Sequence, residues 1–172
     1  MYLDDALLYN QGYMISINDL DSPLFYLFDY DSRSFKINMS FQHFHQFHEI
    51  HILLSGRASH IIEGDYYTLQ PYDIVLLRPS MLHKTEYPSG GDCRRLIINF
   101  RVPDDSPVLH EMLQSCLQPF GAEVPIYRFT GETRAQAFSH LNEIFTLGKQ
   151  PMTPLTQQFI HCHFLQFLAT VA

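Results

Sequence analysis

Short apolar runs separated by turn-forming residues dominate the chain from about residue 24 to residue 102. The most apolar runs cover residues 50–54, 74–77 and 96–100, and turn signals fall at residues 56, 63–65, 71–73, 79–80 and 89–92. Many short strands in succession are typical of a β-sandwich or barrel. Strands that are apolar throughout are expected to be covered on both faces.

The periodicity becomes helical after residue 103. Apolar residues recur every three or four positions in 108–118, in a segment ending near Leu147, and from Leu155 onward. Gly148 is a stop signal for the second segment, and a short extended piece around 126–129 separates the first two. We therefore predict a mainly β fold followed by two to three α-helices: an N-terminal arm at 1–20, a β-barrel at 21–103, and a helical segment at 104–172.

Composition supports one packed domain. The chain has 172 residues, of which 46% are hydrophobic and 17% charged, and such a composition favours a core over disorder. Its formal charge is −7, and its 11 Lys and Arg residues are spread along the chain. The sequence therefore lacks the basic surface that neutralises nucleic-acid phosphates.

The cysteines and the N-terminus point to a reducing compartment. Cys93, Cys116 and Cys162 are odd in number and widely separated, with no C-x-x-C spacing, which argues against a disulfide framework or a cysteine zinc site. The N-terminus lacks a positive n-region, and no apolar run reaches the roughly 20 residues that span a bilayer. We expect a cytoplasmic location and no membrane contact.

Histidines and a carboxylate form the most informative cluster. His43 and His45 are two apart, so on a strand they share a face, and Glu49 and His83 could join them there. Three imidazoles and one carboxylate suit one divalent transition metal, such as Zn, Ni, Fe, Mn or Co. The same groups, with Thr85 and Arg57 as further contacts, could instead bind a small molecule. A buried polar network without a ligand is the third alternative.

The other histidines are expected to matter less. On a regular strand His51 shares the face of Glu49, whereas His48 points away. His161 and His163 lie two apart on a predicted helix and do not face each other.

The spacing of the cluster resembles a known motif. His43-x-His45-x3-Glu49-x6-Gly56 matches the core of the first cupin motif, although Ile37 replaces its leading glycine. The second cupin motif is represented loosely, by Pro79 and His83. Together with residues 48–56 and 64–77, these motifs resemble the N-terminal domain of AraC-type transcription regulators.

That resemblance implies both a fold and a function. The fold would be a cupin, a double-stranded β-helix with a jelly-roll-like barrel, which binds a small-molecule effector. The trailing helices would form a homodimer, and DNA would be bound only by a separate C-terminal domain, expected after residue 172. The effector would change how the N-terminal arm or the helices pack.

A sensor is therefore expected, and not an enzyme. The alternative is a metal-dependent cupin enzyme, an oxygenase or isomerase, that uses His43, His45, Glu49 and His83 as ligands.

Overall fold

The computed structural model describes residues 12–34, 36, 38–103 and 107–172. Two compact units divide this part of the chain. One unit contains Gly12–Val102 and Glu123–Arg128, and includes every strand described below. The other contains Pro103–Ala122 and Phe129–Ala172, with the helices. The predicted mainly β fold with trailing helices is confirmed.

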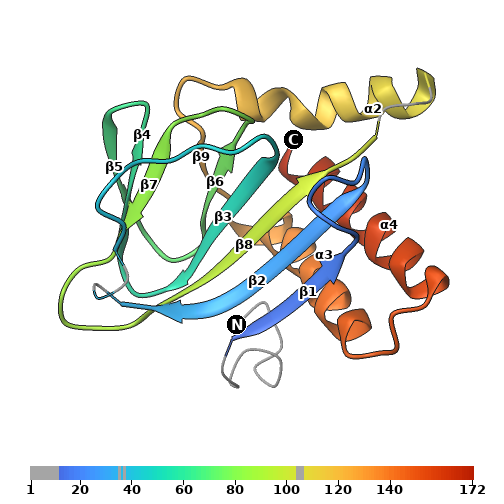
Figure 1. The fold of residues 1–172 in the computed structure, drawn as a ribbon, viewed down its shortest axis with the longest axis horizontal. Coiled ribbons are helices and arrows are strands. Elements are labelled where there is room, and N and C mark those ends of the chain that lie inside the picture. Colours follow the sequence, from blue (N-terminus) through green and yellow to red (C-terminus); the bar gives the residue numbers. More distant parts are fainter. Residues whose placement is uncertain (1–11, 35, 37, 104–106) are drawn as a thin grey trace. The chain divides into compact units, whose positions relative to one another are not determined.

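Two antiparallel sheets build the first unit (Figure 1). The larger has the order β1 (Tyr13–Ile17), β2 (Phe25–Arg33), β8 (Cys93–Arg101), β3 (His48–Ser55), β6 (Asp73–Leu77) and β9 (Ile126–Arg128). The smaller has the order β5 (Asp65–Leu69), β4 (Ala58–Ile62) and β7 (His83–Glu86). This is the β-sandwich that the succession of short strands predicted.

The two faces of the larger sheet differ in polarity, because side chains alternate along each strand. One face is apolar and buried, with Tyr26, Phe28, Ile50, Ile52, Leu96, Ile98 and Phe100 each no more than 1% exposed. By the pairing register, the opposite face contains Asp29, Asp31, Glu49, His51 and Arg95. The strands therefore place a charged surface inside the sandwich.

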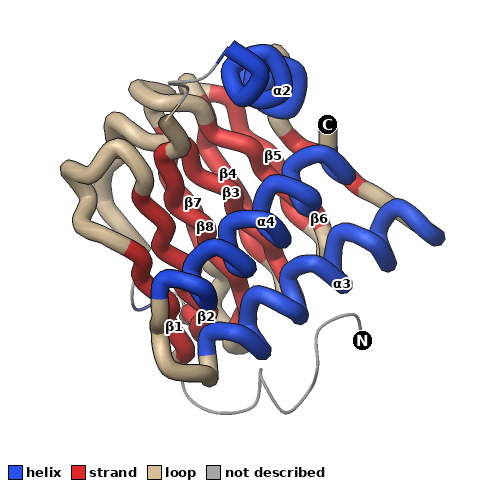
Figure 2. Tube along the Cα trace, turned by 90° about the vertical axis from the view of Figure 1, so that its right-hand side faces the viewer, coloured by secondary structure: helices blue, strands red, loops and turns tan. Residues whose placement is uncertain are grey.

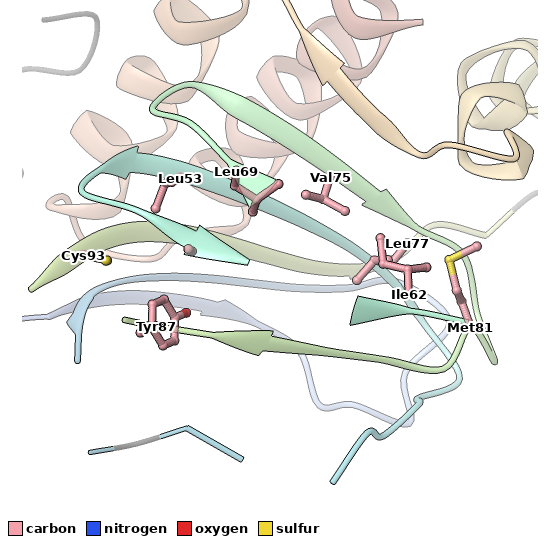
Figure 3. Close-up of a cluster of buried hydrophobic side chains, with 9 residues drawn as sticks. Leu53, Ile62, Leu69, Val75, Leu77, Met81, Tyr87 and Cys93 are labelled. Carbon is pink, nitrogen blue, oxygen red and sulfur yellow. The ribbon is translucent and has the colours of Figure 1, made fainter. Parts of the chain in front are cut away.

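An apolar cluster shares the interior with these polar residues. It draws side chains from both sheets: Leu53, Ala58, Ile62, Leu69, Val75, Leu77, Met81, Tyr87 and Cys93. Figure 3 shows Ile62, Leu77 and Met81 gathered at one end of the cluster, with Tyr87 and Cys93 toward the other. Burial of these side chains holds the two sheets together.

Two predicted boundaries differ from the structure. Tyr13–Ile17, expected within the arm, forms β1 and pairs with β2. Only Ile15 and Ile17 of this strand are buried, so its apolar signal is weak. Ile126–Arg128, placed in the helical segment, forms β9 and pairs with β6. The predicted arm residues 1–11 lie outside the described part of the chain.

The second unit contains α2 (Pro107–Leu117), the short 3₁₀-helix η2 (Gln118–Gly121), α3 (Gly131–Gly148) and α4 (Pro154–Val171). Figure 2 shows α3 and α4 side by side, joined by a short turn. Their buried residues include Phe138, Leu141, Phe145, Phe164 and Phe167. Among the described helices, none combines the length and the hydropathy needed to cross a membrane.

Gly56, the last residue of the first motif, is required by both conformation and space. Its φ is +85°, and a Cβ there would lie 2.9 Å from Cys93 Sγ and 3.1 Å from the Asp92 carbonyl oxygen. Gly64 also has a positive φ, +97°, but a Cβ added to it would meet nothing within 4 Å. Substituting alanine at each of the two positions therefore distinguishes the cost of backbone strain from the cost of steric overlap.

We expect Gly56→Ala to lower the free energy of unfolding by about 2 to 4 kcal/mol, since it adds overlap to strain. Gly64→Ala should cost only the strain, about 1 to 2 kcal/mol. Urea denaturation of the two variants checks this. Equal losses would show that the contact with Cys93 has no energetic weight.

Candidate functional site

Backbone pairing brings the two histidine motifs together within the strand-containing unit. The amide of His43 donates to the His83 carbonyl at 2.9 Å, and the amide of His83 donates to the His43 carbonyl at the same distance. Ser80 N–H donates to the His45 carbonyl at 2.8 Å. Segments about 40 residues apart in sequence are thus fixed beside each other.

Three side chains converge at this junction. His45 Nε2 lies 3.1 Å from Glu49 Oε2, and His83 Nε2 lies 3.9 Å from Glu49 Oε1. One nitrogen of each imidazole and one carboxylate oxygen all lie within 4.8 Å of one another. Glu49 and His83 are buried and His45 is partly buried. We call His45, Glu49 and His83 the triad.

Backbone carbonyls fix the orientation of both triad imidazoles. His45 Nδ1 lies 2.9 Å from the Phe47 carbonyl and His83 Nδ1 lies 2.8 Å from the Met81 carbonyl. A carbonyl oxygen only accepts, so each Nδ1 carries the hydrogen. In a neutral ring Nε2 then presents a lone pair. Both lone pairs are directed toward Glu49.

That arrangement calls for a cation at Glu49. A lone pair and a carboxylate oxygen cannot form a hydrogen bond with each other, so the 3.1 Å contact of His45 with Glu49 needs either an imidazolium or a bound cation. His83 Nε2 is buried and has no hydrogen-bond partner among the described residues. Two imidazoles and a carboxylate, with both second nitrogens held by carbonyls, match the chemistry of a transition-metal site. The triad therefore fits a divalent metal.

The pKa of Glu49 agrees with a positive charge beside its carboxylate. Burial alone would raise the pKa of Glu49, but the close contact with His45, as the imidazolium that donates from Nε2, and the nearby His83 and His60 outweigh it, so the pKa is lowered. Burial, reinforced by His83, lowers the pKa of His43. Glu49 is thus held as a carboxylate, and neutral imidazole is favoured at His43.

His43 is a neighbour of the triad. Its ring centroid lies 4.5 Å from that of His83, but its nitrogens are not within the group of converging ligand atoms found among the described residues. The four-residue metal set expected from the sequence is therefore brought together as three converging groups and one adjacent imidazole.

A cavity of about 230 Å³ opens beside the triad. It is lined by Arg33, Met39, His43, Glu49, His83, Thr85, Tyr87 and Arg95. Thr85, expected as a ligand contact, lies in this lining, and its hydroxyl is 3.3 Å from His60 Nε2. The volume is below the roughly 300 to 1,000 Å³ of pockets for drug-sized ligands, so the cavity suits a small polar molecule.

A charged network forms one wall. Arg95 donates from Nε to Asp31 at 2.9 Å and from Nη2 to Asp29 at 3.3 Å. Arg33 pairs with Asp31 and lies 3.8 Å from Asp29. The sequence prediction missed these four residues as a group. Alternate charges at 29, 31 and 33 were the available signal, since they share one face of a strand.

Tyr87 adds a neutral donor to the same cavity. Burial, offset in part by Arg95, raises the pKa of Tyr87 to about 12, so the phenol keeps its proton. Asn38 holds the backbone of Tyr87 through two hydrogen bonds, at 2.8 and 2.9 Å. In the sequence, Tyr87 stands where the second cupin motif has its terminal Asn, but it was not among the residues expected to contact a ligand.

Two further histidines lie inside the sandwich. His51 and His60 are both 0% exposed, and their ring centroids are 4.9 Å apart. Burial lowers the pKa of His51 to about 3 and that of His60 well below its usual value. His51 shares the face of Glu49 as expected, but it is not part of the cavity lining. His48 stacks on Phe100, with 5.1 Å between ring centroids.

Arg57 is not brought to the cavity. It lies in the β3–β4 turn and lines two other hollows, one with Gly90 and Asp92 and one with Tyr66 and Glu86. The reason is distance along the chain: β3 leads away from Glu49, so the turn that follows it is at the opposite end of the strand.

In the helical unit, His163 lies near His140, at 5.8 Å between ring centroids, and not in the triad.

The sequence comparison gives one family. Residues 36–144 match the profile of the AraC-like ligand binding domain. The search of curated proteins found no significant match.

Structural comparison gives the fold. Apo ToxT from Vibrio cholerae matches with a TM-score of 0.57 and 15% identity, covering 90% of this chain and 57% of that one. A cupin protein from Bacteroides fragilis has a TM-score of 0.45 and 21% identity over 56% of this chain and 83% of that one. A cupin-2 domain protein from Shewanella frigidimarina has a TM-score of 0.40 and 18% identity, over 56% and 87%. The match thus extends over barrel and helices in ToxT.

Proposed function

Because the chain belongs to the AraC-like ligand binding domain family, we propose that it is the effector-sensing and dimerisation domain of an AraC-type transcription regulator in the cytoplasm. DNA would be bound by a separate domain of the regulator, and the net charge of −7 supports a module that does not itself bind DNA. We propose sensing, not catalysis, since the family is defined by ligand binding.

The effector would bind in the cavity beside the triad. The observation that supports this most directly is the cavity of about 230 Å³ beside the triad, with His43, Glu49, His83 and Thr85 on its lining. Arg95 and Tyr87 would add donors that the sequence prediction did not include. The effector would act by preferring one packing state of the domain, with a typical coupling of about 1 to 3 kcal/mol.

A bulky side chain that fills the cavity tests this proposal, because it should block effector binding. We expect small polar compounds to stabilise the wild-type protein, by about 2.7 kcal/mol at a hundred times the dissociation constant, and we expect Thr85→Trp to abolish that gain. A thermal-shift screen of cellular metabolites measures it. Thr68→Trp, at an exposed position of β5, is the matched control and should keep the response. A compound that stabilises the Thr85→Trp variant fully would place its binding elsewhere.

A divalent metal at the triad is a second part of the proposal. His45, Glu49 and His83 would hold it, and the tautomers fixed by Phe47 and Met81 support that assignment. The metal would supply a positive charge and an open coordination position for an oxygen or nitrogen of the effector. His43 would line the pocket without binding the metal.

We also propose homodimerisation through the helices. Leu155 and Phe159 are one turn apart on α4 and are 64% and 49% exposed. Exposed apolar side chains of this size are typical of protein interfaces, and a twofold contact would bury the same pair from both subunits.

Charge at those two positions should separate the subunits. We expect Leu155→Glu/Phe159→Glu to weaken the dimer more than about a hundredfold, since four large apolar side chains lose their burial. Sedimentation velocity across a concentration series measures this. Thr133→Glu/Gln136→Glu, at exposed positions of α3, adds the same charge and should leave the dimer intact. A wild-type monomer at tens of micromolar would contradict the dimer proposal.

A further inference from the structure

The charges around the cavity determine which effectors it can accept. Two guanidiniums, Arg33 and Arg95, line the cavity together with Glu49, and two further carboxylates, Asp29 and Asp31, pair with those guanidiniums. With neutral histidines their sum is −1. A divalent cation at the triad changes it to +1, because a bound metal is the largest local charge in such a site. The sign of the cavity therefore depends on the metal.

The end of the cavity away from Glu49 offers hydrogen-bond donors. Hydrogen bonds among the described residues use two of the five N–H donors of Arg95, both toward aspartates. The Tyr87 phenol is held in its protonated, donating form. Arg33, with its side chain 31% exposed, contributes a second guanidinium. Planar guanidiniums bind carboxylates through paired hydrogen bonds.

The strand register gives the spacing between the two ends of the cavity. Glu49 pairs with Asn99, and Arg95 lies four residues before Asn99 on the same strand. Four residues of β-strand span about 13 Å. Glu49 and Arg95 both line the one cavity, so the space between them suits a ligand a few carbon atoms long with a polar group at each end.

From this geometry we infer that the effector is a small carboxylate that reaches from Arg95 to a metal held by His45, Glu49 and His83, so that metal and carboxylate bind cooperatively. The inference rests on the proposed sensing function and specifies the chemical class of its effector. Thermodynamic linkage requires the coupling to be reciprocal: the carboxylate tightens metal binding by the same factor as the metal tightens carboxylate binding.

Cobalt and matched dicarboxylates test the coupling. The probes are Co²⁺, the dicarboxylates malonate, succinate and glutarate, and the uncharged diamides of the same acids. We expect at least one dicarboxylate to bind about tenfold or more tightly in the presence of Co²⁺ and to alter the visible absorption of the bound ion. The matching diamide should do neither. Calorimetry and absorption titrations of the whole chain provide the two readouts.

Substitutions at each end of the cavity test which residues bind the metal and which bind the carboxylate. Glu49→Gln should remove the effect of Co²⁺ on dicarboxylate binding. Arg33→Gln should weaken dicarboxylate binding while Co²⁺ binding alone changes little, and Arg95→Gln should do so more strongly if it folds. Arg94→Gln, on the opposite face of β8, is the control and should behave as the wild type.

Two kinds of result would overturn the inference. One is equal binding of dicarboxylate and diamide, or dicarboxylate binding that is indifferent to Co²⁺. The other is a complete lack of binding by the dicarboxylate set in the presence of Co²⁺. If neutral metabolites still stabilise the wild type but not Thr85→Trp, the sensing proposal stands and only the carboxylate class is wrong. If no compound distinguishes those two proteins, the sensing proposal itself fails.

Discussion

Acidification from about pH 7 to pH 5 is expected to destabilise the folded chain by several kcal/mol. The pKa of His51 is lowered by burial to about 3, that of His48 to about 4, and that of His60 well below 6.5. The unfolded chain binds these protons near pH 6.5, whereas the folded chain does not. Stability is therefore fully present above the unfolded pKa and is lost as pH falls through it, by about 2 kcal/mol per histidine at pH 5.

Protonation of Glu49 should lower the free energy of unfolding further, at a lower pH than the histidines do. Its pKa is lowered by contacts with the histidines in spite of burial, so the stability it contributes is present above the unfolded value of 4.5 and is lost as pH falls further. Urea denaturation at half-unit pH intervals measures the sum. A flat profile between pH 7 and pH 5 would show that the interior histidines are protonated as readily in the folded state as in the unfolded one.

One substitution removes the contribution of a single histidine from the pH dependence of the unfolding free energy. We expect His51→Leu to reduce the slope of unfolding free energy against pH by about 1.4 kcal/mol per unit below pH 6.5, because one proton no longer binds on unfolding. Ile52→Val, on the neighbouring position of β3, is the control. It should lower stability by about 1 kcal/mol at every pH and leave the slope unchanged.

Zinc affinity is expected to fall by at least about a hundredfold in His83→Ala and in Glu49→Gln. Loss of a group that only orients a metal ligand typically costs 10- to 100-fold in affinity, and a direct ligand should cost no less. Competition with a chromophoric chelator measures the change. Glu49→Gln is nearly isosteric, so a loss there reflects the carboxylate charge and not a change in packing.

His43 provides the discriminating control for the zinc experiment. Its ring packs against His83 but lies outside the three converging ligand atoms, so His43→Ala should leave zinc affinity within about threefold of the wild type. If His43→Ala lost as much zinc affinity as His83→Ala, His43 would be a fourth metal ligand, as the sequence predicted. Zinc binding should also weaken as pH falls, because the ligands must be deprotonated.

Much of the fold followed from local patterns in the sequence. The three helices were predicted close to their observed bounds, because their apolar residues recur at helical spacing and Gly148 marks the end of α3. The interior strands β3, β6 and β8 were equally clear from their continuous apolar runs. Strand β1 was not, because it buries only Ile15 and Ile17. The short β9 was expected as an extended piece around 126–129, but its pairing with β6 was not.

The candidate site divides in the same way. His43, His45, Glu49 and Gly56 were evident because a motif with fixed spacing lies within one local stretch of chain. Arg95 comes from another part of the chain and reaches the cavity through the register of β8 with β2 and β3, which sequence spacing does not reveal. Arg57 was misplaced because its position after β3 puts it at the far end of that strand.

The sequence by itself determined the fold class, the family resemblance and the presence of a histidine cluster, since periodicity and motif spacing are local properties. Only the tertiary structure decided that the ligand atoms of His45, Glu49 and His83 converge while His43 lies beside them. It also decided that Arg33 and Arg95 face the same cavity. Both outcomes depend on pairing between strands distant in the chain, where a shift of one residue would turn each of these side chains to the other face of the sheet.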